Sequence, residues 1–563
     1  MGKDESWYKD AIFYQLHIRA FADGNGDGIG DFLGAAQKLD YLQELGISGI
    51  WLLPFYTSPL RDDGYDVADY YCVHPDYGTL KEFQEFIDAA HARNIRVIAD
   101  LVLNHTSDQH PWFRESRSSP ASPKRDYYVW SATPDRYRQA RVIFKDFETS
   151  NWTWDATAQA YYWHRFFHHQ PDLNYENPQV QQEMLAVMRF WLEQGLDGFR
   201  CDAVPHLFER EGTTCENLPE THAYCKALRR TIDGLHPGRI LLAEANQSPT
   251  ETLAYFGDGD EFHLAFYFPL VPRLLLALAR EARQPLVDLL AQTPPIPASC
   301  QWATFLRNHD EITLSRLTID DREEVLQAYA PDPCTRLNTG IRRRLAPLLQ
   351  NDPRRLELVH SIVLTLPGSP VLYYGDEIGM GDDVSLADRQ GLRTPMQWSR
   401  DHNAGFSQAD PERLYAPVIT DPVYGYRTVN VEAQRPVGDS LFRRLQRLIA
   451  VRKEHSVFGR GSLEMLSPAN PHILSYLRED GDETVVIVQN LSQQTQSVAL
   501  DLRRFAGQTP IDLLRSTRRP PVGEQPYLLD IGPYGFSWLQ FVTGERATTP
   551  RGRAGSHERL HIK

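Results

Sequence analysis

The sequence GFRCDA at residues 198–203 runs from apolar residues straight into a carboxylate, and the pattern recurs in ILLAEA at 240–245 and FLRNHD at 305–310. The three carboxylates are those of Asp202, Glu244 and Asp310. A parallel barrel delivers catalytic groups in this way, at the C-terminal ends of its strands. A lone acidic residue after a strand is more often a helix cap. Three of them, two with an Arg or a His close by, predict a catalytic site, and paired carboxylates are what retaining glycoside chemistry needs.

Strand-like and helix-like stretches alternate outward from these runs, from Ala11 to about His455. The predicted strands are Ala11–His17, Gly49–Pro54, Arg96–Asn104, Gly198–Ala203, Ile240–Ala245, Glu261–Phe268, Trp302–Asn308 and Val371–Gly375. The clearest predicted helices are Phe32–Gly46, Leu80–Asn94 and Gln179–Gly195. Runs such as VIA at 97–99 are apolar on both faces, as buried parallel strands are. The pattern predicts an α/β fold, a closed (β/α)8 TIM barrel.

Two segments interrupt this alternation, and a third follows it. We expect the barrel over 1–104 and 173–455, an inserted small domain B over 105–172 and a lid-like insertion over 311–354. From about residue 461 short strands with a period of two predict a C-terminal antiparallel β-sandwich, assigned to 456–545. The tail at 546–563 is polar without periodicity and is predicted to be disordered. The basic run RRR at 342–344 reads as a solvated helix face.

The amino-acid composition limits which kinds of binding partner are compatible with the chain. The 563 residues carry a formal net charge of −15, which argues against nucleic acid because nothing would neutralise phosphates over a broad surface. The sequence has no run of 18 apolar residues and no apolar signal core at its N-terminus. Six cysteines without a C-x-x-C pair indicate thiols in a reducing compartment. We therefore expect a cytoplasmic protein that acts on a neutral small molecule, with no nucleic-acid or membrane partner; its oligomeric state, a homo-oligomer included, stays open.

A glycine-rich loop, DGNGDGIGD at 23–31, spaces oxygen ligands at alternate positions. It begins like an EF-hand calcium loop, but Gly34 stands at position twelve, where the usual bidentate Glu would be. The alternative is a Gly/Asp surface turn. Because five alternating ligand positions rarely arise without an ion, we expect Ca²⁺ here. Its ligands would come from Asp23, Asn25, Asp27, Ile29 and Asp31.

The acidic runs belong to a wider series of motifs that resembles the α-amylase superfamily, glycoside hydrolase family 13. In order they are DLVLNH at 100–105, GFRCD at 198–202, Glu244 and NHD at 308–310, and the resemblance covers about residues 5–545. It implies that Asp202 is the nucleophile, Glu244 the general acid/base, and Asp310 the carboxylate that grips sugar hydroxyls. Four blocks in sequence are far more specific than any one of them.

The residue spacing is consistent with these implied roles. Arg200 lies two residues before Asp202, on the same side of the strand, so its cation is expected to keep Asp202 ionised. Glu244 follows apolar residues with no cation near it in the sequence, an environment that can raise its pKa. An ionised nucleophile would then stand beside a protonated acid.

The resemblance also implies a sugar pocket and a second cation site. The substrate-binding residues it implies are Tyr65, Asp66, His105, Glu148, Arg200, His309 and Arg393. A closed pocket of this kind favours small oligosaccharides over polymers. The second calcium site would lie between the barrel and domain B, with ligands from Asn104, Asp172, His206, Leu207 and Glu209. One or two structural Ca²⁺ ions are thus expected.

Longer strings resemble one branch of the family, whose members interconvert maltose and trehalose by moving a glucosyl group within one molecule. They are WHRFF at 163–167, HLFEREG at 206–212, ENLPE at 216–220, YFGDGD at 255–260, GIRRRL at 340–345 and NAGF at 403–406. Maltose, trehalose and glucose are the small molecules implied, with minor hydrolysis to glucose. An α-glucosidase of the same fold is the alternative, since it uses the same carboxylates and differs in water access. A catalytically inactive binding subunit is disfavoured, because all three carboxylates are present.

Overall fold

The computed structural model describes residues 5–542 and contains the closed eight-stranded parallel barrel that the sequence predicts. The strand order around the barrel is β1-β16-β12-β11-β10-β9-β5-β2, and every neighbouring pair is parallel. The strands are β1 (Phe13–Leu16), β2 (Gly49–Leu52), β5 (Arg96–Val102), β9 (Gly198–Asp202), β10 (Ile240–Ala243), β11 (Leu264–Phe266), β12 (Gln301–Phe305) and β16 (Ser369–Tyr373). All eight fall inside the predicted ranges or overlap them.

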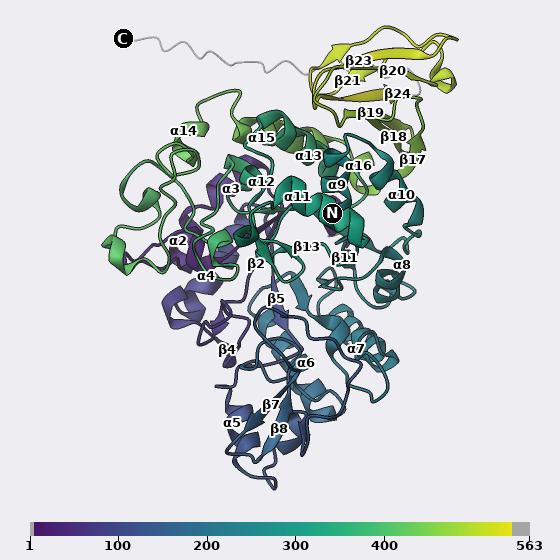
Figure 1. Ribbon diagram of the computed structural model, residues 1–563. Helices are drawn as coiled ribbons and strands as arrows, with labels where there is room; N and C mark the ends of the chain where they lie inside the picture. Colours follow the sequence, from purple (N-terminus) through teal and green to yellow (C-terminus); the bar gives the residue numbers. More distant parts are fainter. Residues whose placement is uncertain (1–4, 543–563) are drawn as a thin grey trace, which may run out of the picture.

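Helices surround the barrel (Figure 1). Capping residues mark where several of them begin. The longer ones are α4 (Leu80–Ala92), α6 (Pro178–Glu193), α7 (Pro219–Leu235), α9 (Leu270–Ala279), α10 (Gln284–Gln292), α13 (Pro353–Thr365) and α15 (Leu441–Glu454). Thr79 and Glu82 form a capping box at the start of α4. Asn177 caps α6, where Pro178 stands at the first turn. The apolar stripe of α6 is fully buried, as its spacing predicted.

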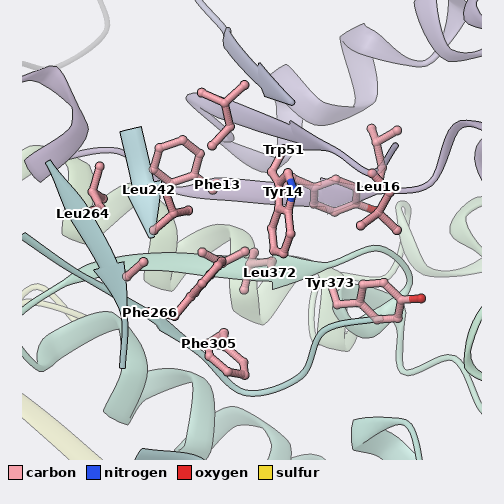
Figure 2. Packing of buried hydrophobic residues seen from close by; sticks show 14 of the residues in the cluster. Phe13, Tyr14, Leu16, Trp51, Leu242, Leu264, Phe266, Phe305, Leu372 and Tyr373 are labelled. Carbon is pink, nitrogen blue, oxygen red and sulfur yellow. The ribbon is translucent and has the colours of Figure 1, made fainter. Parts of the chain in front are cut away.

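The barrel interior is a packed core. Figure 2 shows aromatic and aliphatic side chains from opposite strands meeting there, among them Phe13, Trp51, Leu242 and Phe305. Each is at most 6% exposed. Burial on both strand faces explains why the strands read as continuous apolar runs. This core leaves the strand ends as the place for polar groups.

Two insertions rise from the strand ends. The first carries α5 (Pro111–Ser118) and a three-stranded sheet of β6 (Trp130–Ser131), β8 (Ala160–Trp163) and β7 (Trp152–Asp155). The second carries α11 (Ile319–Tyr329), α12 (Leu345–Leu348) and a small sheet of β13 (Ile312–Thr313), β15 (Gly340–Ile341) and β14 (Arg336–Leu337). In Figure 1 the sheet of the first insertion lies at the end of the molecule opposite the C-terminal strands.

The C-terminal part is the expected antiparallel β-sandwich. A six-stranded sheet comprises β17 (Ser462–Leu466), β18 (Ile473–Asp480), β19 (Glu483–Asn490), β24 (Phe536–Val542), β21 (Ile511–Asp512) and β22 (Thr517–Arg518). Its outer face packs on a two-stranded sheet of β20 (Gln496–Leu500) and β23 (Tyr527–Ile531). Its inner face is fixed to α13, where Trp538 donates to the Ser361 hydroxyl at 3.0 Å. The predicted disordered tail at 546–563 lies outside the described residues.

Two local predictions were wrong. The helix expected over Phe32–Gly46 is two helices, α2 (Phe32–Gln37) and α3 (Leu39–Leu45), broken at Lys38, whose ammonium lies over the Trp398 ring. The basic run at 342–344 is not a solvated helix face. Arg344 is fully buried and donates to the Tyr374 carbonyl at 2.6 Å. Among residues 5–542 no helix combines the length and the apolar character needed to cross a bilayer.

Candidate active site

A cavity opens at the C-terminal ends of β9, β10 and β12, and the three predicted carboxylates line it together. Asp202 is the last residue of β9, Glu244 follows β10 directly, and Asp310 follows β12. The other barrel-side residues that line it include Asp62, Tyr65, His105, Asn246, Asn308, His309 and Arg389. Segments far apart in the sequence thus meet at one rim of the barrel.

Arg200 organises two of these carboxylates from behind. Its guanidinium donates to Asp202, and to Asp100 at 2.5 Å, and its other terminal nitrogen lies 2.6 Å from Glu244 Oε1. The side chain is 1% exposed, so it does not line the cavity. One planar cation therefore holds both carboxyl groups in fixed positions.

The residue after Asp202, Ala203, has φ of +49°, a left-handed conformation that is uncommon for a residue with a Cβ. This turn directs its N–H to Glu244 Oε2 at 3.0 Å. Strain of this kind is typical of functional sites. It fixes the Glu244 carboxyl from a second side.

The environment separates the protonation states of the two carboxyl groups. Burial raises the pKa of Asp202 to about 6 against the opposing effect of Arg200. Burial raises the pKa of Glu244 to about 8, with the charges of Asp202 and Asp310 adding to it and Arg200 again opposing. The sequence placed no cation near Glu244, but the structure does. Burial outweighs it, and near neutral pH Asp202 is mostly ionised while Glu244 keeps its proton.

Asp310 is held in its charged form. Burial alone would raise its pKa, but His309, Arg389 and Arg393 together lower it well below its ordinary value. Arg389 donates to Asp310 Oδ1 at 2.8 Å and Arg393 at 3.1 Å. Arg389 also donates to Asp62 Oδ1 at 2.7 Å. Two carboxylates and a guanidinium therefore form a charged edge suited to sugar hydroxyls.

The two predicted histidines and Tyr65 line the cavity as expected. Tyr65 stacks on His309 with ring centroids 5.3 Å apart and planes 7° apart. Gln15 lies 2.7 Å from His309 Nδ1, which fixes that ring. Burial lowers the pKa of His105 to about 3, so its ring is neutral. Its buried Nε2 has no hydrogen-bond partner within the described part of the chain.

Besides Arg200, three predicted substrate-binding residues lie outside the cavity lining. Asp66 is fully buried and accepts hydrogen bonds from the Ser58 hydroxyl and from two backbone N–H groups. Glu148 accepts from the His168 N–H at 2.8 Å. Arg393 is 1% exposed and supports Asp310 from behind. None of the three is among the residues that line the cavity.

Asp62 and Arg389 are two of the site residues that the sequence reasoning missed. Both line the cavity and pair with each other. Asp62 stands in the same short acidic motif, RDDGYD at 61–66, from which Asp66 was chosen. Arg389 lies four residues before Arg393, in ADRQGLR at 387–393. The sequence indicates which stretches lie near the site, but only the fold shows which side chain in each stretch lines the cavity.

Both insertions roof the cavity. The first contributes Arg141, Ile143, Phe144 and Phe166, and the second contributes Glu311, Thr313, Ser315, Asn338 and Thr339. The two are joined where the Asn338 N–H donates to Asp146 Oδ2 at 2.7 Å. The second is also fixed to the barrel rim, because Arg316 donates to the Asn246 carbonyl at 2.9 Å. The roof therefore consists of bonded segments, not loosely overhanging loops.

Three buried oxygens near the cavity lack partners among the described residues and suit a cation. They belong to Asn104, Asp172 and Glu209, of which none is more than 6% exposed. Burial raises the pKa of Asp172 to about 8. Burial also raises the pKa of Glu209 well above its ordinary value, and the charge of Asp172 adds to that rise. Leaving one buried oxygen of each carboxyl group without a partner is costly, and an oxygen-seeking cation would remove that cost.

The loop at 23–31 gives a different result. Its carboxylates accept backbone N–H groups; Asp31, for example, caps α2 through Gly34 and also accepts from Gly24 and Asn25. Over residues 5–542 no three His, Cys, Asp or Glu side chains gather closely enough to hold a metal ion by themselves. A cation at either place would therefore need amide and backbone oxygens as well.

Comparison with known proteins agrees with the fold and the site described above. The α-amylase catalytic-domain family matches residues 15–331 and 335–461, and the maltogenic-amylase C-terminal domain matches 463–538. The chain is 54% identical to a trehalose synthase/amylase of Mycobacterium tuberculosis (strain H37Rv), covering 99% of this chain and 94% of that protein. It is 53% identical to a trehalose synthase of Pimelobacter sp. (strain R48), covering 98% of each.

Solved structures resemble it over nearly the whole length. The trehalulose synthase MutB from Pseudomonas mesoacidophila is 27% identical, with a TM-score of 0.76, and the match covers 95% of this chain and 99% of that one. The α-glucosyl transfer enzyme XgtA is 28% identical, with the same TM-score and the same coverage.

Proposed function

Because the chain belongs to the α-amylase family, we propose that it interconverts maltose and trehalose by retaining, intramolecular glucosyl transfer, with minor hydrolysis to glucose. Full-length similarity to trehalose synthases supports this substrate pair. The structural observation that carries the proposal is the bonded roof over the three carboxylates, since transfer without hydrolysis requires that water be kept out.

In the first step an oxygen of the ionised Asp202 attacks the anomeric carbon of the non-reducing glucose of maltose. Glu244 gives its proton to the bridging oxygen, and the bond between that oxygen and the anomeric carbon breaks. The products are a glucosyl ester on Asp202 and free glucose. Asp310, held ionised by Arg389 and Arg393, would bind hydroxyls of the ring that becomes positively charged.

In the second step the freed glucose turns within the cavity and presents its anomeric hydroxyl. Glu244, now a carboxylate, takes the proton of that hydroxyl as its oxygen attacks the anomeric carbon and the ester bond to Asp202 breaks. Two inversions at one carbon give net retention and an α,α linkage. Arg200 contacts both carboxyl groups and so fixes their separation, which retaining chemistry requires to be short.

An α-glucosidase of the same fold is the second candidate. It would use the same first step and then admit water, releasing two glucose molecules from maltose. This candidate is supported by similarity to a glucan 1,6-α-glucosidase of Streptococcus pneumoniae, which is 31% identical over 88% of this chain. The two candidates differ in the fate of the freed glucose.

That difference gives a direct test. Incubating the protein with maltose and isotopically labelled free glucose should yield trehalose with little label, because the freed glucose does not leave. The anomeric proton signals of trehalose and glucose report both products over time. Label in trehalose in proportion to its share of the glucose pool would show that glucose exchanges. Free glucose as the main product at all temperatures would favour the α-glucosidase instead.

We propose that one or two Ca²⁺ ions stabilise this structure. The stronger candidate site has Asn104, Asp172 and Glu209 as side-chain ligands, with backbone carbonyls of His206 and Leu207. A cation there would neutralise two buried carboxylates and fix the first insertion to the barrel. The loop at 23–31 is the second candidate, on the spacing of its oxygens.

Chelation is therefore expected to lower the melting temperature, because an ion that binds only the folded state stabilises it by mass action. At about 100 times Kd the stabilisation is about 2.7 kcal/mol. Asp172→Asn should reproduce most of the loss and leave only a small further effect of chelator, while Asp27→Ala should reproduce a smaller part. Asp135→Asn, at an exposed position of the first insertion, is the matched control. Identical melting curves with and without chelator, after unfolding and refolding in its presence, would contradict both sites.

We propose a cytoplasmic location, supported by the cysteines. All six are free thiols, and Cys72 and Cys334 are exposed without a disulfide partner. Exposed thiols persist in a reducing compartment.

A further inference from the structure

The cavity has two chemically different sides. The barrel side carries ionisable groups, including Asp202, Glu244, Asp310 and Arg389. The side formed by the second insertion has one ionisable lining residue, Glu311, and otherwise offers neutral groups, namely the hydroxyls of Thr313, Ser315 and Thr339 and the amide of Asn338. Charged groups hold a ligand in one orientation, whereas hydroxyls can each donate or accept. The neutral side is the one against which a sugar could change orientation.

Asn338 is the most tightly fixed residue on this neutral side. It occupies the turn between β14 and β15 with φ of +52°, a conformation that Asn tolerates better than most residues. Its backbone N–H donates to Asp146 Oδ2 at 2.7 Å, and its Nδ2 donates to Glu311 Oε1 at 2.8 Å. The first bond crosses from one insertion to the other. The residue is thus held at both its backbone and its side chain.

The remaining polar atom of this side chain is unused. Asn338 Oδ1 is buried and has no hydrogen-bond partner within residues 5–542, and Asn338 lines the cavity. A buried acceptor without a donor costs free energy unless a ligand or water supplies one. Since Nδ2 is engaged by Glu311, the amide orientation is set, and Oδ1 is the atom of this amide that is left to accept a hydrogen bond.

We propose that Asn338 determines specificity by retaining the freed glucose, with Oδ1 accepting a hydrogen bond from a hydroxyl of that sugar while it turns. The inference rests on the proposed function and assigns the released sugar, not the transferred one, to the neutral side of the cavity. Asp146 acts as a positioning residue, because it holds the turn that carries Asn338 against the first insertion.

The test forms the glucosyl ester from α-glucosyl fluoride and adds labelled glucose as the acceptor. Fluoride release counts the intermediates formed, and trehalose and unlabelled glucose count the two ways each intermediate is consumed. Wild-type protein should give labelled trehalose that saturates with glucose concentration. Asn338→Gly keeps the backbone N–H and permits the positive φ, but removes the amide. It should raise the glucose concentration for half-maximal trehalose formation about tenfold, as expected for one lost hydrogen bond.

Asp146→Ala tests the bridge separately, since it leaves the amide of Asn338 in place. It should raise free glucose relative to trehalose several-fold from maltose and admit more label. Asp135→Ala, which removes an exposed carboxylate from the same insertion, is the matched control and should leave the ratio as in wild type. A wild-type acceptor dependence in Asn338→Gly, with trehalose still formed, would overturn the role of Asn338. Failure of wild-type protein to form trehalose at any glucose concentration would instead overturn the proposed function, and the inference with it.

Discussion

Asp202→Asn is expected to lower the rate of maltose conversion by at least about 10⁴-fold while the chain still folds. The amide has nearly the shape of the carboxylate, but it cannot act as the anionic nucleophile that forms the glucosyl ester. The measurement is trehalose plus glucose formed from maltose per enzyme over hours. Loss should extend to α-glucosyl fluoride, because that substrate also needs the ester.

The fold of this variant should be intact for a structural reason. Arg200 would still find an acceptor in the oxygen of the substituted amide, and it keeps its contacts with Asp100 and Glu244. A melting temperature within a few degrees of wild type is the control. Turnover within tenfold of wild type by a folded variant would contradict the assignment of Asp202.

Much of the fold could be predicted from the sequence because barrel strands are buried on both faces. VIA at 97–99 and ILLA at 240–243 can be read only as buried strands or helix cores, and their length favours strands. The C-terminal sandwich could be predicted from the sequence for a different reason. Its strands alternate, as in β20, where buried Val498 and Leu500 are separated by an exposed Ala499.

The sequence could not reveal what depends on contacts between distant segments. The run at 342–344 reads as surface because arginines usually lie there. In the fold Arg342 donates to the Leu386 and Asp388 carbonyls, and Arg344 lies over the rings of Tyr373 and Tyr374. Loosening this run would therefore disturb buried packing as well as the roof. Asp146 is a better site for perturbing the roof alone, because its bond to the Asn338 N–H joins the two insertions.

The candidate site shows the same division. The three carboxylates, His105 and His309 were predictable because they stand within ordered motifs at strand ends. Asp66 was selected from the correct motif, whereas Arg393 was selected from RTPMQW at 393–398, a stretch that begins four residues after Arg389. Asp62 and Arg389 are the residues that line the cavity. A motif fixes where a loop starts, whereas the loop's own hydrogen bonds decide which side chain faces the ligand. Asp66, bonded to Ser58 and to backbone N–H groups, is committed to holding its loop.

Because Asp202 and Glu244 are assigned different roles, Glu244→Gln is expected to lose activity on maltose but not the ability to react with α-glucosyl fluoride. With maltose, loss of the general acid should cost about 10²- to 10⁴-fold, because the departing glucose oxygen must be protonated. With α-glucosyl fluoride the leaving group needs no proton, so the ester on Asp202 should still form and should accumulate as a burst of fluoride. Mass spectrometry of the denatured protein can count the attached glucosyl groups. Equal loss with both substrates would show that Glu244 is not the acid.

The pH profile follows from the two raised pKa values and tests the assignment independently. For wild-type protein kcat/KM with maltose should rise through about pH 6, as Asp202 loses its proton, and fall through about pH 8, as Glu244 loses the proton that it must donate. Because Arg200 contacts both carboxyl groups, these are apparent pKa values of a coupled pair. Each limb of the profile therefore reports the titration of the pair as well as that of one residue.

Glu244→Gln has no titrating acid, and its reaction with α-glucosyl fluoride should keep the acidic limb and lose the alkaline one. Since Glu244 is already neutral where Asp202 titrates, the neutral amide should leave the acidic limb close to its wild-type position. An alkaline limb that survives in the variant would assign that titration to another group and leave Glu244 without its role as acid.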